Sequence, residues 1–169
     1  MPSGAQRGSY WRLSPVYVAG FLDGEGCISI RRAVKNGSDT YTVFCSISNT
    51  NIDILKELNR KYGGRLHIDG RKPGRFAPCG NWCLMGAEAV RFMKKIVKHT
   101  IIKKKQINVA FDFWKHKEPF HRTNQPKPPG FIEECRRYHE LLKSMHGKQG
   151  KPWRKFPPEI IEEEMKIVN

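Results

Sequence analysis

The sequence predicts an α+β domain in which one antiparallel four-stranded sheet carries helices on a single face. Two pairs of segments alternate between apolar and polar residues, as half-buried strands do. Segments with a helical spacing of apolar residues lie before, between and after these pairs. The order is therefore helix, hairpin, helix, hairpin, helix, which is typical of an α+β fold. The second face of the sheet is polar and basic, so it is free to meet a partner.

The first helix begins after Ser14, a favourable N-cap residue, with Pro15 at the first helical position. Gly20 and Gly24 lie four residues apart and so share one helix face, although each costs ~1 kcal/mol relative to alanine. Ala19 widens this flat stripe. The pattern predicts that another backbone packs very closely against the helix.

Glu25 ends this helix between two glycines. A carboxylate in that position faces the negative end of the helix dipole, which is unfavourable unless a cation is bound nearby. We therefore interpret the stretch as a close-packing helix that delivers a carboxylate to a cation site.

Two hairpins and two helices follow. Residues 27–32 and 40–48 alternate as strands around a turn at 36–39. A helix at 52–62 ends at two glycines. Strands at 65–69 and 81–85 then flank a basic turn at 71–75, and a second helix covers 87–99. In the second strand, alternation predicts core positions at Tyr41, Val43, Cys45 and Ile47, and outward positions at Thr40, Thr42, Phe44 and Ser46.

The remaining chain is predicted to be helical. Residues 100–114 have a helical spacing of apolar residues, and a linker with four prolines spans 118–130. A helix covers 131–146, and a last short helix begins near 157. We assign residues 1–169 to a single domain, with a core at about 14–115 and a C-terminal helical extension at about 131–169. The sequence has no internal repeat, so the glycine-rich helix occurs once.

Composition points to a polyanionic partner. Lys and Arg number 31 against 16 Asp and Glu, giving a formal net charge of +15. No apolar run reaches membrane-spanning length and no signal peptide opens the chain, so we expect an intracellular protein that is not secreted and has no membrane partner. The five scattered cysteines favour reduced thiols, with Cys27 and Cys45 as small buried residues. Cys79 and Cys83 have no second ligand pair that would complete a zinc site.

Residues 18–26, which read VAGFLDGEG, resemble the LAGLIDADG motif of homing endonucleases. The resemblance extends over about residues 14–115. It implies an αββαββα fold whose saddle-shaped sheet lies in the DNA major groove. It also implies an intron- or intein-associated enzyme that makes a metal-dependent double-strand break in a long, pseudo-palindromic DNA target, acting in the cytoplasm, nucleoid or an organelle.

A single motif requires a partner helix, which a second copy of the chain would supply as a symmetric homodimer. The resemblance places the dimer interface at Tyr17, Ala19, Gly20, Asp23 and Gly24. Two Glu25 carboxylates would then lie together and repel each other unless a divalent metal neutralises them, and hard oxygen ligands suit Mg²⁺. Ca²⁺ or Mn²⁺ can substitute in binding. The backbone carbonyl of Gly24 is the implied second metal ligand in each chain.

Two further residues take catalytic roles from the resemblance. Lys105 corresponds to the active-site lysine of the family, with Lys103 and Lys104 as rivals and simple phosphate affinity as the alternative. Asn49, at the end of the second strand, corresponds to a polar residue that orders solvent near the metal. Helix capping is an equally good explanation of Asn49. Asp23 is expected to hold the interface rather than to act in catalysis.

Outward positions of the strands are the expected DNA contacts, because arginine can read guanine, asparagine can read adenine, and short hydroxyls read less specifically. Contact with phosphate or solvent is the alternative for about half of them. These positions are Ser29, Arg31, Lys35, Thr40, Thr42, Ser46, Arg65, His67, Arg71, Arg75 and Asn81.

Two other functions fit the same fold. An intron maturase would bind intron RNA and assist splicing without cutting DNA, and a transcriptional regulator would bind DNA without cleaving it. Loss of the acidic residue would favour either of them. The presence of Glu25 favours the nuclease, although glutamate is longer than the aspartate more common in the family.

Overall fold

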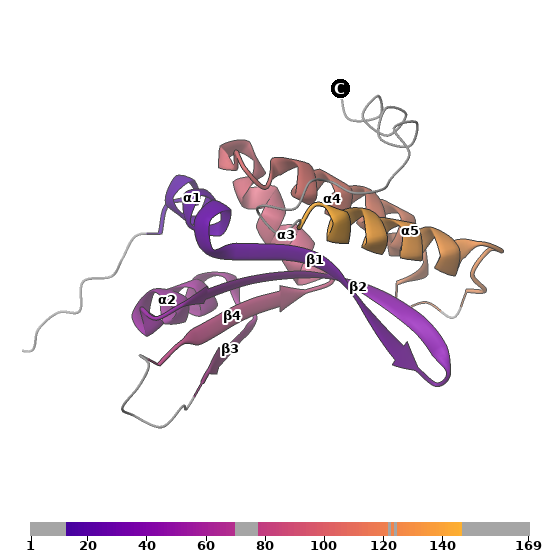
Figure 1. The fold of residues 1–169 in the computed structure, drawn as a ribbon, viewed down its shortest axis with the longest axis horizontal. Helices are drawn as coiled ribbons and strands as arrows, with labels where there is room; N and C mark the ends of the chain where they lie inside the picture. The colour runs from indigo at the N-terminus through magenta and orange to yellow at the C-terminus, as the bar shows by residue number, and fades with distance from the viewer. Residues whose placement is uncertain (1–12, 70–77, 122, 124, 147–169) are drawn as a thin grey trace, which may run out of the picture.

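The computed structural model describes residues 13–69, 78–121, 123 and 125–146. The expected contacts Arg71 and Arg75 and the expected last helix near 157 lie outside these residues. The elements, shown in Figure 1, are α1 (Pro15–Glu25), β1 (Gly26–Lys35), β2 (Ser38–Asn49), α2 (Ile52–Tyr62), β3 (Arg65–Ile68), β4 (Gly80–Met85), α3 (Ala87–Ile96), α4 (Lys104–Lys117) and α5 (Phe131–Ser144). Short 3₁₀ turns follow α3 at Val97–His99 and α4 at Glu118–Phe120.

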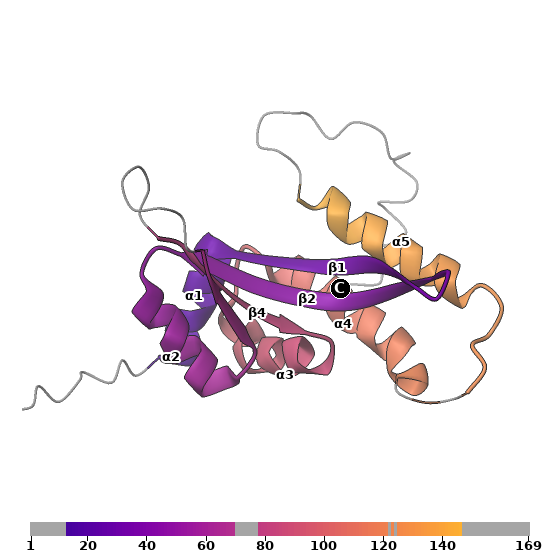
Figure 2. The ribbon, with the colours of Figure 1, turned by 90° about the horizontal axis from the view of Figure 1, so that it is seen from below.

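The four strands form one antiparallel sheet in the order β1-β2-β4-β3. β1 and β2 make a long hairpin that extends beyond the rest of the sheet (Figures 1 and 2). Its loop is only Asn36 and Gly37, whose φ angles of 51° and 74° give the two-residue turn that matches strand twist. The loop is tighter than the turn expected at 36–39, because Ser38 and Asp39 already pair with β1.

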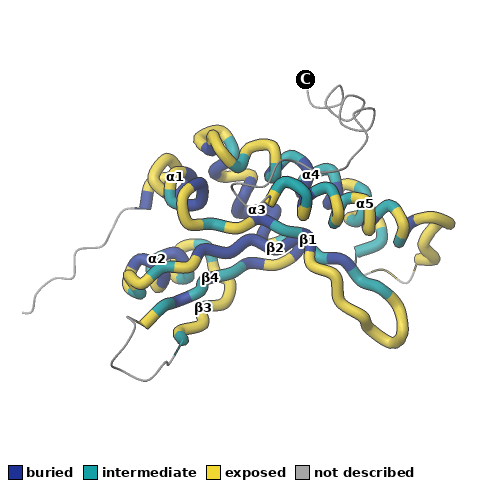
Figure 3. Tube along the Cα trace, viewed as in Figure 1, coloured by how far each residue is buried: buried dark blue, intermediate teal, exposed yellow. Residues whose placement is uncertain are grey.

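The core lies on one face of the sheet, as expected. Each of the helices α1 to α5 packs against strands of the sheet, and the buried core forms between them (Figures 2 and 3). The strand side chains that face this core are Ile28, Ile30, Tyr41, Val43, Cys45, Ile47, Trp82 and Leu84. This is an α+β domain with its helices on one face, and the second face of the sheet is open. No helix among the described ranges is both long and apolar enough to span a membrane.

The two cysteines expected in the core differ. Cys45 is fully buried, and burial raises the pKa of its thiol far above the usual value, so the thiol stays protonated. The prediction for Cys27 is wrong, because Cys27 is exposed at the start of β1. Its position alternates with Ile28 and therefore points away from the core, where its sulfur lies 3.7 Å from Nε2 of His146.

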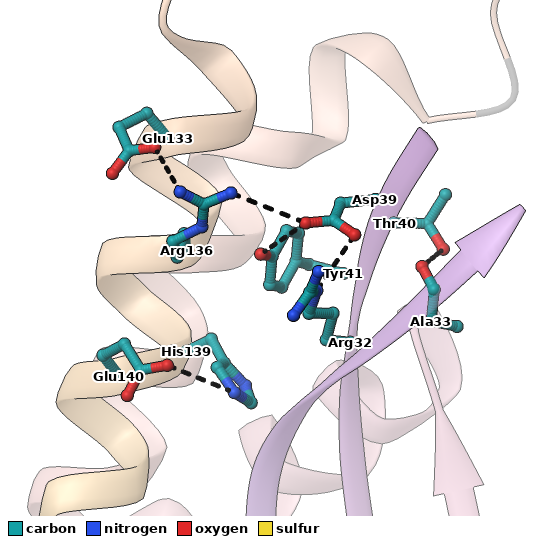
Figure 4. Close-up of polar contacts among 9 residues, drawn as sticks. All are labelled: Arg32, Ala33, Asp39, Thr40, Tyr41, Glu133, Arg136, His139 and Glu140. Carbon is teal, nitrogen blue, oxygen red and sulfur yellow. Dashed lines mark hydrogen bonds and ion pairs between the residues drawn. The ribbon is translucent and has the colours of Figure 1, made fainter. Parts of the chain in front are cut away.

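The helical extension packs on the hairpin rather than apart from it. On α5, Arg136 lies 3.6 Å from Asp39 of β2, whose carboxylate also pairs with Arg32 at 2.9 Å (Figure 4). The hydrogen bond from Arg32 is the main reason that the pKa of Asp39 is lowered. His139 Nδ1 lies 2.5 Å from the carbonyl oxygen of Ile30 and covers the edge strand β1. These contacts hold the hairpin against α5.

Candidate active site and DNA-facing sheet

Local sequence forms α1 as expected. The Ser14 hydroxyl accepts a hydrogen bond from the backbone N–H of Tyr17 at 3.1 Å, and Pro15 occupies the first turn. The helix runs directly into β1 through Gly26, whose N–H donates to the carbonyl of Leu22. A β-carbon at Gly26 would lie 2.5 Å from the backbone carbonyl oxygen of Leu22, so only glycine fits this junction. The junction fixes Glu25 at the boundary between helix and sheet.

The two faces of α1 have different environments. Tyr17, Gly20 and Gly24 are exposed, and a β-carbon at either glycine would meet no atom of the described residues within 4 Å. Ala19 is fully buried and Asp23 is 9% exposed, so both belong to the opposite face. The assignment of Ala19 and Asp23 to an interface with a second chain is therefore corrected. Three of the five expected interface residues remain on the free face.

Asp23 instead holds the turn that precedes α4. Its carboxylate accepts hydrogen bonds from the backbone N–H groups of Ile101 at 2.7 Å, Ile102 at 3.2 Å and Lys103 at 2.9 Å. This explains why α4 begins at Lys104 and not near residue 100. The carboxylate satisfies N–H groups at the start of a helix, as a capping residue does. Asp23 therefore fixes the start of α4 against the end of α1.

Among the three candidate lysines, the structure favours Lys103. Its Nζ donates to the backbone carbonyl of Asp23, in the last turn of α1 and two residues before Glu25. Lys104 and Lys105 are exposed on the first turn of α4. Lys103 is thus the candidate whose ammonium group contacts the last turn of α1, and the role of Lys105 stays a prediction. The capping of this turn by Asp23 brings Lys103 there, which spacing in the sequence could not reveal.

Glu25 is exposed and lies next to the end of β2, because Gly26 pairs with Ile47 in the ladder. Asn49 is the last residue of β2, so the two expected site residues come to the same end of the sheet. The side-chain oxygen of Asn49 accepts a hydrogen bond from the backbone N–H of Asn51 at 2.8 Å. Asn51 is the N-cap of α2. Asn49 therefore supports the turn before α2 but does not cap the helix, because Asn51 is the capping residue. The role of Asn49 near a metal stays a prediction.

The open sheet face carries the outward strand residues in rows. Arg31 of β1 lies opposite Thr42 of β2. Cys83 of β4 lies between Ser46 of β2 and Arg65 of β3. Asn81 of β4 lies opposite His67 of β3. This places Ser29, Arg31, Lys35, Thr40, Thr42, Ser46, Arg65, His67 and Asn81 on the face away from the core.

Several of these side chains already have partners or little exposure. Thr40 donates its hydroxyl proton to the carbonyl of Ala33 at 2.9 Å, and the Thr42 hydroxyl lies 3.4 Å from Nζ of Lys117. Ser46 is only 7% exposed, so it offers little surface for contact. The amide of Asn81 donates to Ser48 at 2.7 Å. The arginines, Lys35 and His67 are exposed and offer more surface on this face.

One residue of this face was not expected to matter. Phe44 points away from the core, yet it is only 3% exposed. The guanidinium carbon of Arg31 lies 3.1 Å from the centre of its ring. The diagonal placement of the two residues on paired strands is the sequence signal that could have indicated this contact.

Comparison with known proteins gives structural matches only. No family model and no curated protein matches the sequence. The homing endonuclease I-CvuI, solved in complex with its target in the presence of Ca, superposes with a TM-score of 0.64 at 17% identity, over 91% of this chain and 93% of that chain. The archaeal intron-encoded homing endonuclease I-Vdi141I, solved with DNA, gives a TM-score of 0.63 at 16% identity, over 85% and 88%.

This chain has the LAGLIDADG homing-endonuclease fold. It spans nearly all of I-CvuI but only 45% of the LAGLIDADG homing endonuclease I-SmaMI, which it matches at 15% identity with a TM-score of 0.60 over 82% of this chain. The extent of the match agrees with the single copy of the motif. The chain thus corresponds to the single-motif type of the fold.

Few groups near the end of α1 can serve as metal ligands. Among the residues that the structure describes, no three His, Cys, Asp or Glu side chains come together as a metal site. Asp23 is occupied by three N–H groups, so Glu25 is the carboxylate at this end of α1 that has no partner among the described residues. Carbonyl groups in the last turn of a helix lack intrahelical partners and can serve as oxygen ligands. Glu25 and the Gly24 carbonyl therefore fit half of an oxygen-ligand site for Mg²⁺.

Proposed function

We propose that this chain is a site-specific DNA endonuclease that acts as a homodimer and hydrolyses phosphodiester bonds in both strands of a long, nearly palindromic target with Mg²⁺. The observation that carries the proposal is the exposed Glu25 at the end of α1, directly beside the open Gly20 and Gly24 face. Both features occur on a fold shared with homing endonucleases that were solved with DNA.

The homodimer follows from the free face of α1. A second α1 helix can approach Gly20 and Gly24 closely, because no described atom fills the space above them. Apolar side chains surround this face: Val16 is 61% exposed and Tyr17 is 50% exposed. The turn held by Asp23 adds Ile101, which is 84% exposed. A two-fold axis along this face would bury these side chains and bring the two Glu25 carboxylates together.

The chemistry at the paired site uses a few groups of each chain. When bound, Mg²⁺ supplies activation of water and stabilisation of the leaving oxygen. Glu25 and the Gly24 carbonyl would hold the cation beside the DNA phosphates. The ammonium group of Lys103, near the end of α1, stabilises negative charge that develops on the scissile phosphate. Asp23 keeps this lysine in position by capping the start of α4.

The open sheet face binds the DNA. It carries the exposed cations Arg31, Lys35 and Arg65, and the net charge of +15 on the chain favours a polyanion. Two such sheets side by side in a dimer would follow an extended, pseudo-palindromic target. Association with an intron or intein would place the target at the insertion point of this gene.

A Glu25→Gln variant tests the proposal. It removes the charged metal ligand but keeps the size of the side chain, so cleavage of DNA that spans the gene's insertion point should be abolished while binding survives. Glu88→Gln, at an exposed glutamate on the first turn of α3, is the matched control and should cleave normally. Normal cleavage by Glu25→Gln would show that the mechanism is wrong.

Binding, cleavage and splicing assays of the wild-type protein separate the two other functions. Wild-type protein that binds this DNA tightly in Mg²⁺ but does not cut it would be a regulator. Wild-type protein that binds the intron transcript and promotes its splicing, with no cleavage of DNA, would be a maturase.

A further inference from the structure

Phe44 and Arg31 form a stacked pair in the middle of the open sheet face. Phe44 lies on β2 between Ser29 of β1 and Met85 of β4, with which it pairs in the ladder. Arg31 lies two residues after Ser29, toward the hairpin tip, and pairs with Thr42. Its side chain is therefore diagonal to Phe44 on the same face of the sheet. Its guanidinium carbon is 3.1 Å from the ring centre, within the distance range of a cation–π contact.

The side chain of Arg31 covers Phe44 on the open face. Phe44 is only 3% exposed and lies outside the cluster of core residues under the helices. The Arg31 guanidinium covers one face of the ring. Arg31 itself is exposed, so its side chain lies between the ring and solvent.

Arg31 has no ion pair among the residues that the structure describes. The carboxylate of Asp39, on the same hairpin, is paired with Arg32 and Arg136 on the helix side (Figure 4). A guanidinium carries five N–H donors in one plane, and stacking on a ring occupies only its flat face. The donor edges of Arg31 therefore stay free for a ligand while the ring restricts the side chain.

We propose that Phe44 is a positioning residue that holds Arg31 ready to read a guanine in each half-site of the target. Arginine binds the O6 and N7 acceptors of guanine through two parallel hydrogen bonds, a geometry that depends on the orientation of the guanidinium plane. The ring of Phe44 sets that plane before DNA arrives and so lowers the entropy lost on binding. The inference rests on the proposed function, because it names part of the substrate of the same DNA-binding face.

A measurement without DNA tests the stack itself. The Phe44 ring should shift the side-chain proton resonances of Arg31 upfield in the NMR spectrum of the free protein. Phe44→Leu should remove the shift, and Phe44→Tyr should keep it. Val34→Ala, on the same hairpin but outside the stack, is the control and should leave these resonances unchanged.

A second measurement tests the reading of guanine. Binding is measured for targets that carry each of the four bases at each position, at two salt concentrations. Arg31→Lys should keep the salt dependence but lose preference for guanine at one position per half-site, on the order of ten-fold. Phe44→Leu should reduce the same preference about two- to five-fold, the contribution expected of an exposed cation–π contact. Phe44→Tyr should restore it, and Phe44→Leu should have no further effect in an Arg31→Lys background.

Three outcomes would overturn the inference. An unchanged base preference in Phe44→Leu, with only a lower melting temperature, would make the pair purely structural. An equal loss of affinity for every sequence in Arg31→Lys and Phe44→Leu would make Arg31 a phosphate contact. An absent ring-current shift would remove the stack. Failure of the wild-type protein to bind any DNA would instead refute the proposed function, and the NMR result would remain to show whether the stack exists.

Discussion

Replacing Asp23 by alanine should destabilise the fold by about 2–4 kcal/mol, because three backbone N–H groups would lose a charged acceptor. A buried hydrogen bond to a charged group contributes about 1.5–3 kcal/mol, and loss of an N-cap costs about 0.5–2 kcal/mol. The sum lies at the lower end here, because the three hydrogen bonds are only partly buried. Asp23→Asn keeps one oxygen acceptor and should cost about 1–2 kcal/mol.

Urea unfolding of the variants at one fixed protein concentration measures these changes. Asp53→Ala is the matched control, since Asp53 lies in the first turn of α2 but is exposed and forms an ion pair with Lys56 at 3.0 Å. It should cost less than about 1 kcal/mol. Equal losses for Asp23→Ala and Asp53→Ala would refute the capping role. A loss confined to dimer dissociation, with an unchanged monomer, would return Asp23 to the interface between chains.

Three further changes test the site and its surroundings. Gly20→Leu should give a stable monomer in sedimentation. Its β-carbon meets no described atom within 4 Å, so the fold tolerates the leucine, but the side chain blocks a second helix. A persistent dimer would place the interface elsewhere. Lys103→Met should lower the cleavage rate much more than Lys105→Met, and the reverse result would restore Lys105. Burial lowers the pKa of Lys117 below 10.5, so the unfolded chain binds more protons and stability rises with pH between the lowered value and 10.5. This rise should be absent in Lys117→Met and retained in Lys115→Met, as unfolding at several pH values would reveal.

Elements defined by local chemistry were predictable from sequence. Ser14 and Pro15 start α1, and the two glycines after Tyr62 end α2 at the expected residue. Alternation along β2 correctly placed Tyr41 and Val43 on the core face. These features depend on side chains within a few residues of each other, so a linear pattern contains them. The motif that ends in Glu25 is also contained in a short stretch of sequence.

The orientation of α1 could not be obtained in this way. Apolar residues occur around the whole helix, so spacing alone does not say which face meets the rest of the chain. Packing buries Ala19 and directs Asp23 toward the turn before α4. Both residues had been expected on the free face with Gly20, and only the structure separates them.

Distance along the chain explains the difference. The sequence determined the elements, their order and the single acidic motif, because those signals are local. The tertiary structure decided which residues share a site. The carboxylate of Asp23 accepts a hydrogen bond from the backbone N–H of Lys103, 80 positions later. This contact places Lys103, of three adjacent lysines, at the end of α1. Arg31 covers Phe44 through strand register, and a shift of register by one residue would move Arg31 to the core face. These contacts depend on how distant segments pack, which no short stretch of sequence specifies.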